Sequence, residues 1–253
     1  MLDVESIYFK LPKTGEEGFF VQYEELDHFY NRLHHHPELQ LVYIIEGRGD
    51  LYIGDSITNF GPKSLFLIGS NQNHIFKSAP EYFKEDSSKL SRSISVFFHE
   101  KSLGENFFEI SEMSTIRNLI EQANRGLYFY PDVAEKIGQR LCQLTQKSGF
   151  SKFIDILSIL NELACVQTFE YLAKVCSKQP PSDQESSKVN DVINYILTHY
   201  KEDIELETIA SVAHYSKAAF CKFFKQHTRK TFSEFLNEVR ISQACKLLQR
   251  GDL

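Results

Sequence analysis

Residues 204–228, IELETIASVAHYSKAAFCKFFKQHT, decide the organisation of the C-terminal part of this chain. Apolar residues such as Leu206 and Ile209 recur at helical spacing in the first half of the stretch, and Phe220 and Phe224 recur likewise in the second. The pattern predicts two short helices joined by a tight turn. Such a pair is typical of a helix-turn-helix, whose second helix lies in the major groove of DNA.

The second of these helices has two distinct faces. At about 100° per residue, Ala218, Lys222 and Lys225 fall opposite the phenylalanines, with Cys221 and Gln226 beside them. The surrounding residues 213–250 carry eight Lys or Arg against two acids, within a chain of net charge -6. A basic face in an acidic protein favours nucleic-acid binding. We therefore predict these DNA-binding residues: Ser216, Lys217, Ala218, Cys221, Lys222, Lys225 and Gln226.

The length and composition of the chain indicate its broad class of protein. A chain of 253 residues with 42% apolar residues is expected to form two globular domains. The five cysteines (142, 165, 176, 221 and 245) are odd in number and show no CxxC spacing, which favours buried free thiols in a reducing compartment. We find no signal peptide and no apolar run of membrane-spanning length, so we expect a cytoplasmic protein without membrane contact.

The first hundred residues have the pattern of a β domain. Short segments rich in β-branched and aromatic residues are separated by glycine-containing turns. This spacing predicts an all-β barrel or a double-sheet jelly roll. The expected strands are 19–23, 39–46, 50–53, 64–68 and 94–98, and the polar segment 82–92 is expected to be a loop.

Histidines in this β domain are the chemically suggestive residues. His34 and His36 are two apart, which puts both imidazoles on one face of a strand, and His74 lies at the far end of a later hairpin. The stretches LHHHPELQLVYIIEG (33–47) and GPKSLFLIGSNQNH (61–74) resemble the two motifs of a cupin domain. In metal-binding cupins the ligands are two His, a Glu and a third His. The resemblance places these ligands at His34, His36, Gln40 and His74.

Gln40 stands where that motif has glutamate. A neutral amide is a poor ligand for a transition metal, so we favour a pocket that hydrogen-bonds a small molecule, and we expect no metal and no cofactor. A metal at His34, His36 and His74 is the weaker alternative, and histidines that merely pack around a barrel are the third. The predicted ligand-binding residues are His34, His36, Gln40, Tyr43 and His74.

The middle of the chain changes to helical periodicity. We expect helices at 112–126, 131–144 and 153–176, packed on the barrel or forming a dimer interface. Residues 177–188 are Ser- and Pro-rich and predict a linker. The expected domains are a barrel at 1–110, a helical dimerisation segment at 111–176, the linker, and a DNA-binding domain at 189–253.

The C-terminal module begins with an amphipathic segment at 189–200. Thr231 and Glu234 have the spacing of a capping box and should open a long helix over 232–249. Residues 204–252 closely resemble the DNA-binding domain of the AraC/XylS transcription regulators, which join a cupin-like sensor to two helix-turn-helix units. The resemblance implies that Lys222 faces DNA and that Ala218 and Cys221 approach base edges.

The chain departs from the AraC/XylS pattern at three places. His214 stands where the turn often has glycine, and Arg229 stands where glycine usually follows the second helix. The family pattern also continues past Leu253 with a second helix-turn-helix. We therefore expect this chain to be truncated before that second unit, with an incomplete DNA-binding domain that binds its operator weakly.

Together these features predict an α+β multidomain protein: an N-terminal cupin-like β-barrel with a helical segment, and a C-terminal all-α helix-turn-helix domain. The expected function is sequence-specific transcription regulation controlled by a small-molecule effector in the barrel. The expected partners are double-stranded operator DNA, an effector for which a sugar is one candidate, and a second copy in a homodimer, with RNA polymerase a further candidate. The alternatives are a cupin-type metal-dependent enzyme with an appended helical domain and a bare dimerisation module.

Overall fold

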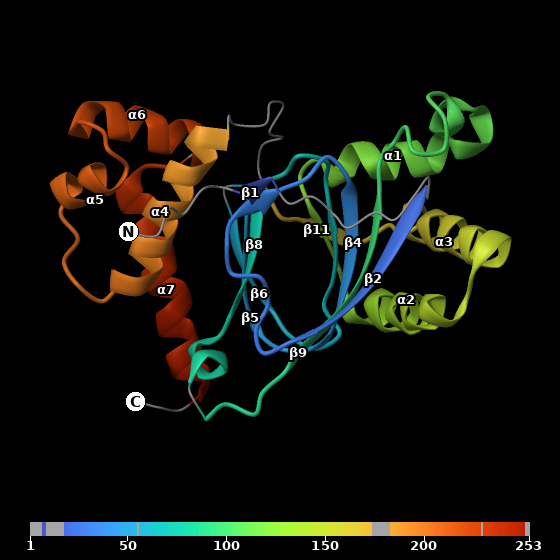
Figure 1. Ribbon diagram of the computed structural model, residues 1–253, viewed down its shortest axis with the longest axis horizontal. Coiled ribbons are helices and arrows are strands. Elements are labelled where there is room, and N and C mark those ends of the chain that lie inside the picture. Colours follow the sequence, from blue (N-terminus) through green and yellow to red (C-terminus); the bar gives the residue numbers. More distant parts are fainter. Residues whose placement is uncertain are drawn as a thin grey trace.

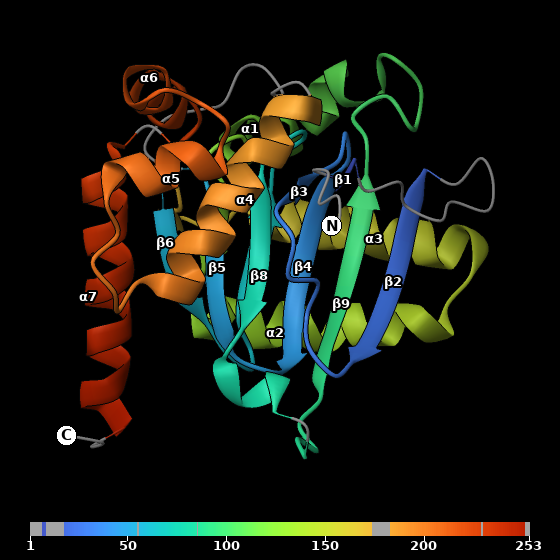
Figure 2. The ribbon, with the colours of Figure 1, turned by 60° about the vertical axis from the view of Figure 1, so that its left-hand side comes forward.

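The computed structural model describes residues 7–8, 18–54, 56–84, 86–173, 183–228 and 230–250. Four layers follow one another: helices α4–α7, a five-stranded sheet, a six-stranded sheet, and helices α1–α3 (Figures 1 and 2). This arrangement confirms the expected sheet-rich N-terminal part and helical C-terminal part. The predicted barrel needs one correction, because the described strands form two facing sheets, as in the jelly-roll alternative, rather than one closed barrel.

The strands pair antiparallel except for β1 and β3, which are parallel. The five predicted strands are confirmed as β2, β4, β5, β7 and β9, and the last begins inside the expected loop. In spatial order the first sheet contains β1 (Ile7–Tyr8), β3 (His34–His35), β8 (His74–Ser78), β5 (Gly49–Ile53) and β6 (Ser56–Phe60). The second contains β11 (Phe169–Tyr171), β10 (Leu127–Phe129), β7 (Leu65–Ile68), β4 (Leu39–Glu46), β9 (Ser91–Phe98) and β2 (Phe19–Leu26).

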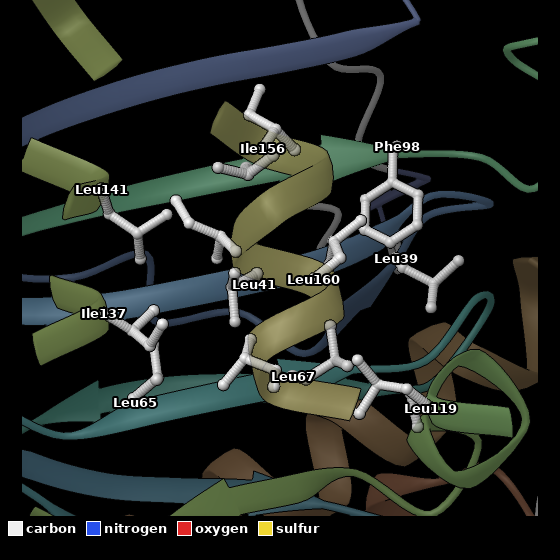
Figure 3. Packing of buried hydrophobic residues seen from close by; sticks show 14 of the residues in the cluster. Leu39, Leu41, Leu65, Leu67, Phe98, Leu119, Ile137, Leu141, Ile156 and Leu160 are labelled. Atoms are coloured by element: carbon white, nitrogen blue, oxygen red, sulfur yellow. The ribbon is translucent and has the colours of Figure 1, made fainter. Parts of the chain in front are cut away.

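Both faces of the six-stranded sheet are buried. Successive side chains of a strand point to opposite faces. On β4, Leu39 and Leu41 therefore pack against helices, while Gln40, Val42 and Ile44 point between the two sheets. This double burial explains why β4 reads as a nearly continuous apolar run. The helix-facing core is shown in Figure 3, with residues such as Leu65, Leu67, Ile137, Leu141, Ile156 and Leu160.

Three helices cover the outer face of that sheet: α1 (Ser114–Ala123), α2 (Pro131–Gln143) and α3 (Gly149–Ala164). The first two agree with the sequence prediction. The third was predicted to reach residue 176, but it ends at Ala164, where the apolar periodicity lapses, and β11 then adds to the sheet edge beside β10. Short 3-10 turns occupy Pro80–Phe83, Phe107–Glu109, Ser111–Met113 and Leu144–Gln146.

The C-terminal part contains α4 (Asp183–His199), α5 (Leu206–Val212), α6 (Lys217–Thr228) and α7 (Phe232–Arg250). Helix α4 begins within the segment expected as linker, and residues 174–182 lie outside the described range. The capping box is confirmed at the start of α7. The backbone N–H of Thr231 donates to Glu234 Oε2 at 2.7 Å, and the backbone N–H of Glu234 donates to Thr231 Oγ1 at 3.3 Å.

The C-terminal helices pack directly on the outer face of the five-stranded sheet. Leu33, Tyr52 and Ile75 of the β domain share one buried cluster with Val189 of α4 and Phe235 of α7. Figure 2 shows α4 and α7 lying along this sheet. The two domains are therefore coupled by apolar contact, and this contact was not predicted from the sequence.

Two further expectations concern solvent and membrane. Cys142, Cys165 and Cys221 are free, as predicted, but they are exposed rather than buried, because they lie on the outward faces of their helices or helix ends. No helix within the described ranges has both the length and the apolar character that a membrane span requires.

Candidate functional site

A cavity lies between the two sheets. It is partly open to solvent and leaves about 40 Å³ of space for the centres of water-sized molecules. Three of the five predicted ligand residues, His34, His36 and Gln40, lie on its wall. The other lining residues are Gln22, Glu24, Phe29, Tyr30, Val42, Ile44, Phe76, Ser93 and Phe97.

His74 lies directly behind this wall. It pairs with His34 across β3 and β8, and their ring centroids are 4.3 Å apart. The ring of His36 is 5.2 Å from that of His74. One ring nitrogen from each of the three lies within 4.8 Å of the others. The structure thus brings together three histidines that are up to forty residues apart in the sequence.

Each of these imidazoles is held by a main-chain carbonyl. Nδ1 of His34, His36 and His74 lies 2.9, 2.8 and 2.8 Å from a carbonyl oxygen two residues away. A carbonyl only accepts, so Nδ1 carries the hydrogen and Nε2 presents a lone pair. Burial lowers the pKa of all three residues, that of His34 to about 3, and the neighbouring imidazoles lower those of His34 and His74 further. All three are neutral at pH 7.

Gln40 reaches the histidines from the opposite sheet. Its Nε2 donates to Ser95 Oγ at 3.0 Å, and its Oε1 lies 3.4 Å from His36 Nε2. Gln40 Oε1 and His36 Nε2 are both acceptors in this arrangement. The nearby Nε2 of His74 is buried, and within the described part of the chain it has no hydrogen-bond partner. The corner formed by these residues therefore concentrates lone pairs.

The remaining wall combines polar residues with aliphatic and aromatic side chains, and it carries little charge. Burial raises the pKa of Glu24, and a hydrogen bond with Ser93 partly opposes that rise. Gln22 donates to Glu24 at 3.0 Å. None of the described residues that line the cavity is Lys or Arg. The site is consequently suited to a neutral polar ligand or a cation rather than to an anion.

Tyr43 is a correction to the predicted ligand set. It lies on the helix-facing side of β4, where its ring packs so closely on Gly138 of α2 that a Cβ there would come within 2.2 Å. Alternation along the strand explains the error, because Tyr43 is an odd number of residues from Gln40. The sequence reasoning also missed Gln22, Glu24 and Ser93, although alternating polar residues on β2 and β9 mark the same inner face.

Helices α5 and α6 form the predicted helix-turn-helix. The chain turns at His214, whose φ of 56° lies in the left-handed region that glycine adopts more readily. The backbone N–H of Tyr215 donates to the Ala210 carbonyl at 3.0 Å and closes the turn. Phe220 and Phe224 are fully buried against the helices around them. The departure from glycine at position 214 is therefore accommodated with the expected backbone shape.

The opposite face of α6 is open to solvent. Ala218, Cys221, Lys222 and Lys225 are exposed, as the helical projection predicted. The remaining predicted contacts have other roles or lie outside the described atoms. Ser216 Oγ accepts the backbone N–H of Ala219 at 3.4 Å and caps the helix, Lys217 forms an ion pair with Glu207, and the side chain of Gln226 is outside the described residues.

A sheet-rich domain with an internal cavity, packed against a helix-turn-helix with a cationic outer face, has the architecture of a ligand-responsive DNA-binding regulator. Residues 16–85 match the family described as AraC-like ligand binding domain. The chain is 24% identical to the HTH-type transcriptional regulator YdeC of Bacillus subtilis over 88% of its length and 75% of the relative's. It is also 24% identical to YfiF of the same organism, over 93% and 73%. The chain carries an AraC-like ligand-binding domain and is homologous to HTH-type transcriptional regulators.

Solved structures show a more distant similarity. ToxT of Vibrio cholerae with a bound unsaturated fatty acid is 13% identical over 97% of this chain and 85% of that one, with a TM-score of 0.37. The AraC-like transcriptional activator CuxR is 11% identical over 82% and 67%, with a TM-score of 0.34.

Proposed function

We propose that this chain is a sequence-specific DNA-binding transcription regulator whose affinity for DNA is controlled by a small molecule bound between the two sheets. One observation carries the proposal: α6 buries its aromatic face and leaves Lys222 and Lys225 exposed on the other. Phosphate contacts from such cations supply affinity, while base-edge contacts supply specificity. The names of both relatives agree with this role. Ala218 and Cys221 are the proposed base-edge neighbours.

The decisive experiment selects DNA from a random pool with the purified chain. Enrichment of a common motif, bound at least about a thousandfold more tightly than scrambled DNA, supports sequence-specific recognition. Binding that falls steeply with salt but does not distinguish sequences would reduce the function to phosphate contact alone. RNA polymerase is a further proposed partner, and the role places the protein in the cytoplasm with the DNA that it binds.

The proposed effector is a neutral, polar molecule with several hydrogen-bond donors, for which a sugar is the leading candidate. The cavity offers acceptors on His34, His36 and Gln40, and aromatic faces on Phe76 and Phe97. A thermal-shift screen of sugars, sugar phosphates and organic acids tests the class. A specific ligand stabilises the folded state by mass action, and neutral sugars should raise Tm more than their phosphates.

The proposed route of control crosses the five-stranded sheet. Residues of β3 and β8 alternate between faces, so His34 lines the cavity with His74 next to it, while Leu33 and Ile75 join the cluster with the C-terminal helices. A ligand that shifts the inner residues shifts the outer ones with them. The sensor, residues 1–176, and the DNA-binding part, residues 189–253, would then be coupled reciprocally.

A homodimer is proposed through the outer face of α3. Phe150 is 76% exposed and Ile154, one turn later, is 45% exposed, an unusual pair of large apolar side chains in solvent. A two-fold axis would bring this face against its own copy. Ile154→Glu should shift the sedimentation profile from dimer to monomer. Gln139→Glu adds the same charge to an exposed position of α2 and should leave the dimer intact.

The proposed role is regulatory rather than catalytic. The cupin-type enzyme alternative gains support from the convergence of His34, His36 and His74. Among the described residues lining the cavity, however, Glu24 is the one carboxylate, and burial raises its pKa. The homology to transcriptional regulators supports the regulatory reading over this alternative.

A further inference from the structure

We propose that a second small-molecule site lies where the C-terminal helices pack on the five-stranded sheet, and that it binds a short, uncharged alcohol. A pocket is present at this junction, and none of its described lining residues also lines the cavity between the two sheets. The inference goes beyond regulation by a molecule in that cavity and does not depend on it. We call this second site the junction pocket.

Both domains contribute to the wall of the junction pocket. Tyr52 of β5 and Ser56 of β6 line it from the sheet, whereas Val189 and Ile193 of α4 and Phe235 of α7 line it from the helices. Except for Ser56, these residues belong to one buried apolar cluster. The complete wall therefore exists only while the helices are docked. A molecule that binds here stabilises the docked arrangement by mass action.

Asn73, which lies directly before β8, supplies the polar recognition group. Its Oδ1 is buried, and within the described part of the chain this oxygen has no hydrogen-bond partner. The main chain is held, because the Asn73 carbonyl accepts the backbone N–H of Gly54 at 3.4 Å. The terminal torsion of an asparagine side chain is soft, so the oxygen can turn toward the pocket without a change in the backbone. A hydroxyl on the bound molecule would then donate to an acceptor that otherwise pays the cost of burial alone.

The size and charge of the junction pocket define the class of ligand. The pocket leaves about 50 Å³ of space for the centres of water-sized molecules, which is room for about three to five groups of that size. None of its described lining residues is acidic, basic or histidine. An unpaired charge is costly to bury in such surroundings, so ions are disfavoured. A short apolar body with one hydroxyl group fits both the walls and Asn73.

Binding is tested by NMR on the full chain with labelled isoleucine methyl groups, titrated with cyclopentanol. Ile53 and Ile193 line the junction pocket from its two sides, and Ile44 lines the cavity between the sheets. We expect the Ile53 and Ile193 methyl signals to shift saturably with one common Kd, while the Ile44 signal changes little. Shifts that do not saturate would overturn the proposal, and so would shifts confined to Ile44.

Cyclopentanone is the matched probe, because it has the same ring and its carbonyl oxygen only accepts. One hydrogen bond separates the two probes, so cyclopentanol should bind about 3- to 10-fold more tightly. Asn73→Leu should bring the two affinities to within about 2-fold while cyclopentanone still binds, a result that loss of folding cannot imitate. Asn59→Leu, at an exposed position of β6 outside the pocket, is the control and should keep the wild-type preference. Equal affinities in the wild-type chain would overturn the proposal, as would an undiminished preference in Asn73→Leu.

Ile57→Asp tests whether the helices are needed for the site. Ile57 packs against the cluster that joins the sheet to the helices, so a charge there should open the junction. We expect the Ile53 methyl signal to lose its response to cyclopentanol in this variant. A retained response in a chain whose helices have undocked would overturn a site built from both domains. None of these results bears on DNA selection, so the regulator proposal is tested separately.

Discussion

Lys217, the first residue of α6, forms an ion pair with Glu207 in the first turn of α5, with 2.8 Å between Nζ and Oε2. Both side chains are exposed, so the pair contributes little to folding stability. Its consequence is electrostatic. The Glu207 carboxylate lies beside the cationic face of α6 and pairs with Lys217, one of the predicted DNA-binding residues.

Replacing that carboxylate should strengthen DNA binding. Glu207→Gln releases Lys217 and removes repulsion of phosphate, so we expect about 2- to 5-fold higher affinity at low salt, with the gain shrinking as salt rises. Fluorescence anisotropy across a salt series measures it. Glu105→Gln removes an acid from an exposed ion pair with Lys101 in the sensor and should change nothing. A gain of equal size in both variants would show an effect of net charge alone.

Lys222 is predicted to be the central contact of α6. Lys222→Ala should weaken binding to the selected motif by about 1–3 kcal/mol if the lysine reads a base edge. A gel-shift titration at fixed salt gives the affinity, and competition with scrambled DNA shows whether specificity falls as well. Lys201→Ala removes another exposed lysine of the C-terminal part and serves as the control. Unchanged affinity would remove Lys222 from the interface.

Glu24 should make stability depend on pH. Its pKa in the folded protein is raised by burial, above the value of about 4.3 that glutamate has in an unfolded chain. The folded state therefore binds this proton more tightly. The free energy of unfolding falls as pH rises from the unfolded value through the folded one. Glu24→Gln should match the wild type near pH 4 and be more stable at pH 7 in urea titrations. Glu100→Gln, at an exposed position, should not reproduce this difference.

Docking of the C-terminal helices should depend on Ile57 of β6, which packs against their shared cluster. Ile57→Asp puts a charge into this contact. It should weaken the free energy of docking between the C-terminal helices and the sheet by about 1–3 kcal/mol, while both domain cores remain intact. Calorimetry should then show two separate unfolding transitions in place of one. Asn59→Asp adds the same charge at an exposed position of the same strand, outside this cluster, and should keep the single transition.

Much of the local structure could be predicted from the sequence. Helices α1, α2 and α6 follow from apolar periodicity, and the start of α7 follows from Thr231 and Glu234, because these signals act within one or two turns of chain. The end of α3 was misplaced, since β11 forms by pairing with a distant strand. Strands β3 and β8 were missed for a similar reason. Both are short, and they exist through pairing, β3 with β1 and β8, and β8 with β3 and β5.

The sequence by itself determined the order of a β domain and a helix-turn-helix, and it determined which face of α6 is aromatic and which is cationic. Only the tertiary structure decided that His34, His36 and His74 meet, that Tyr43 faces the helices, and that the C-terminal helices rest on the five-stranded sheet. Periodicity encodes the face of an element, because side-chain direction follows from the backbone. It does not encode which elements meet. That depends on strand register and on packing between residues far apart in the chain.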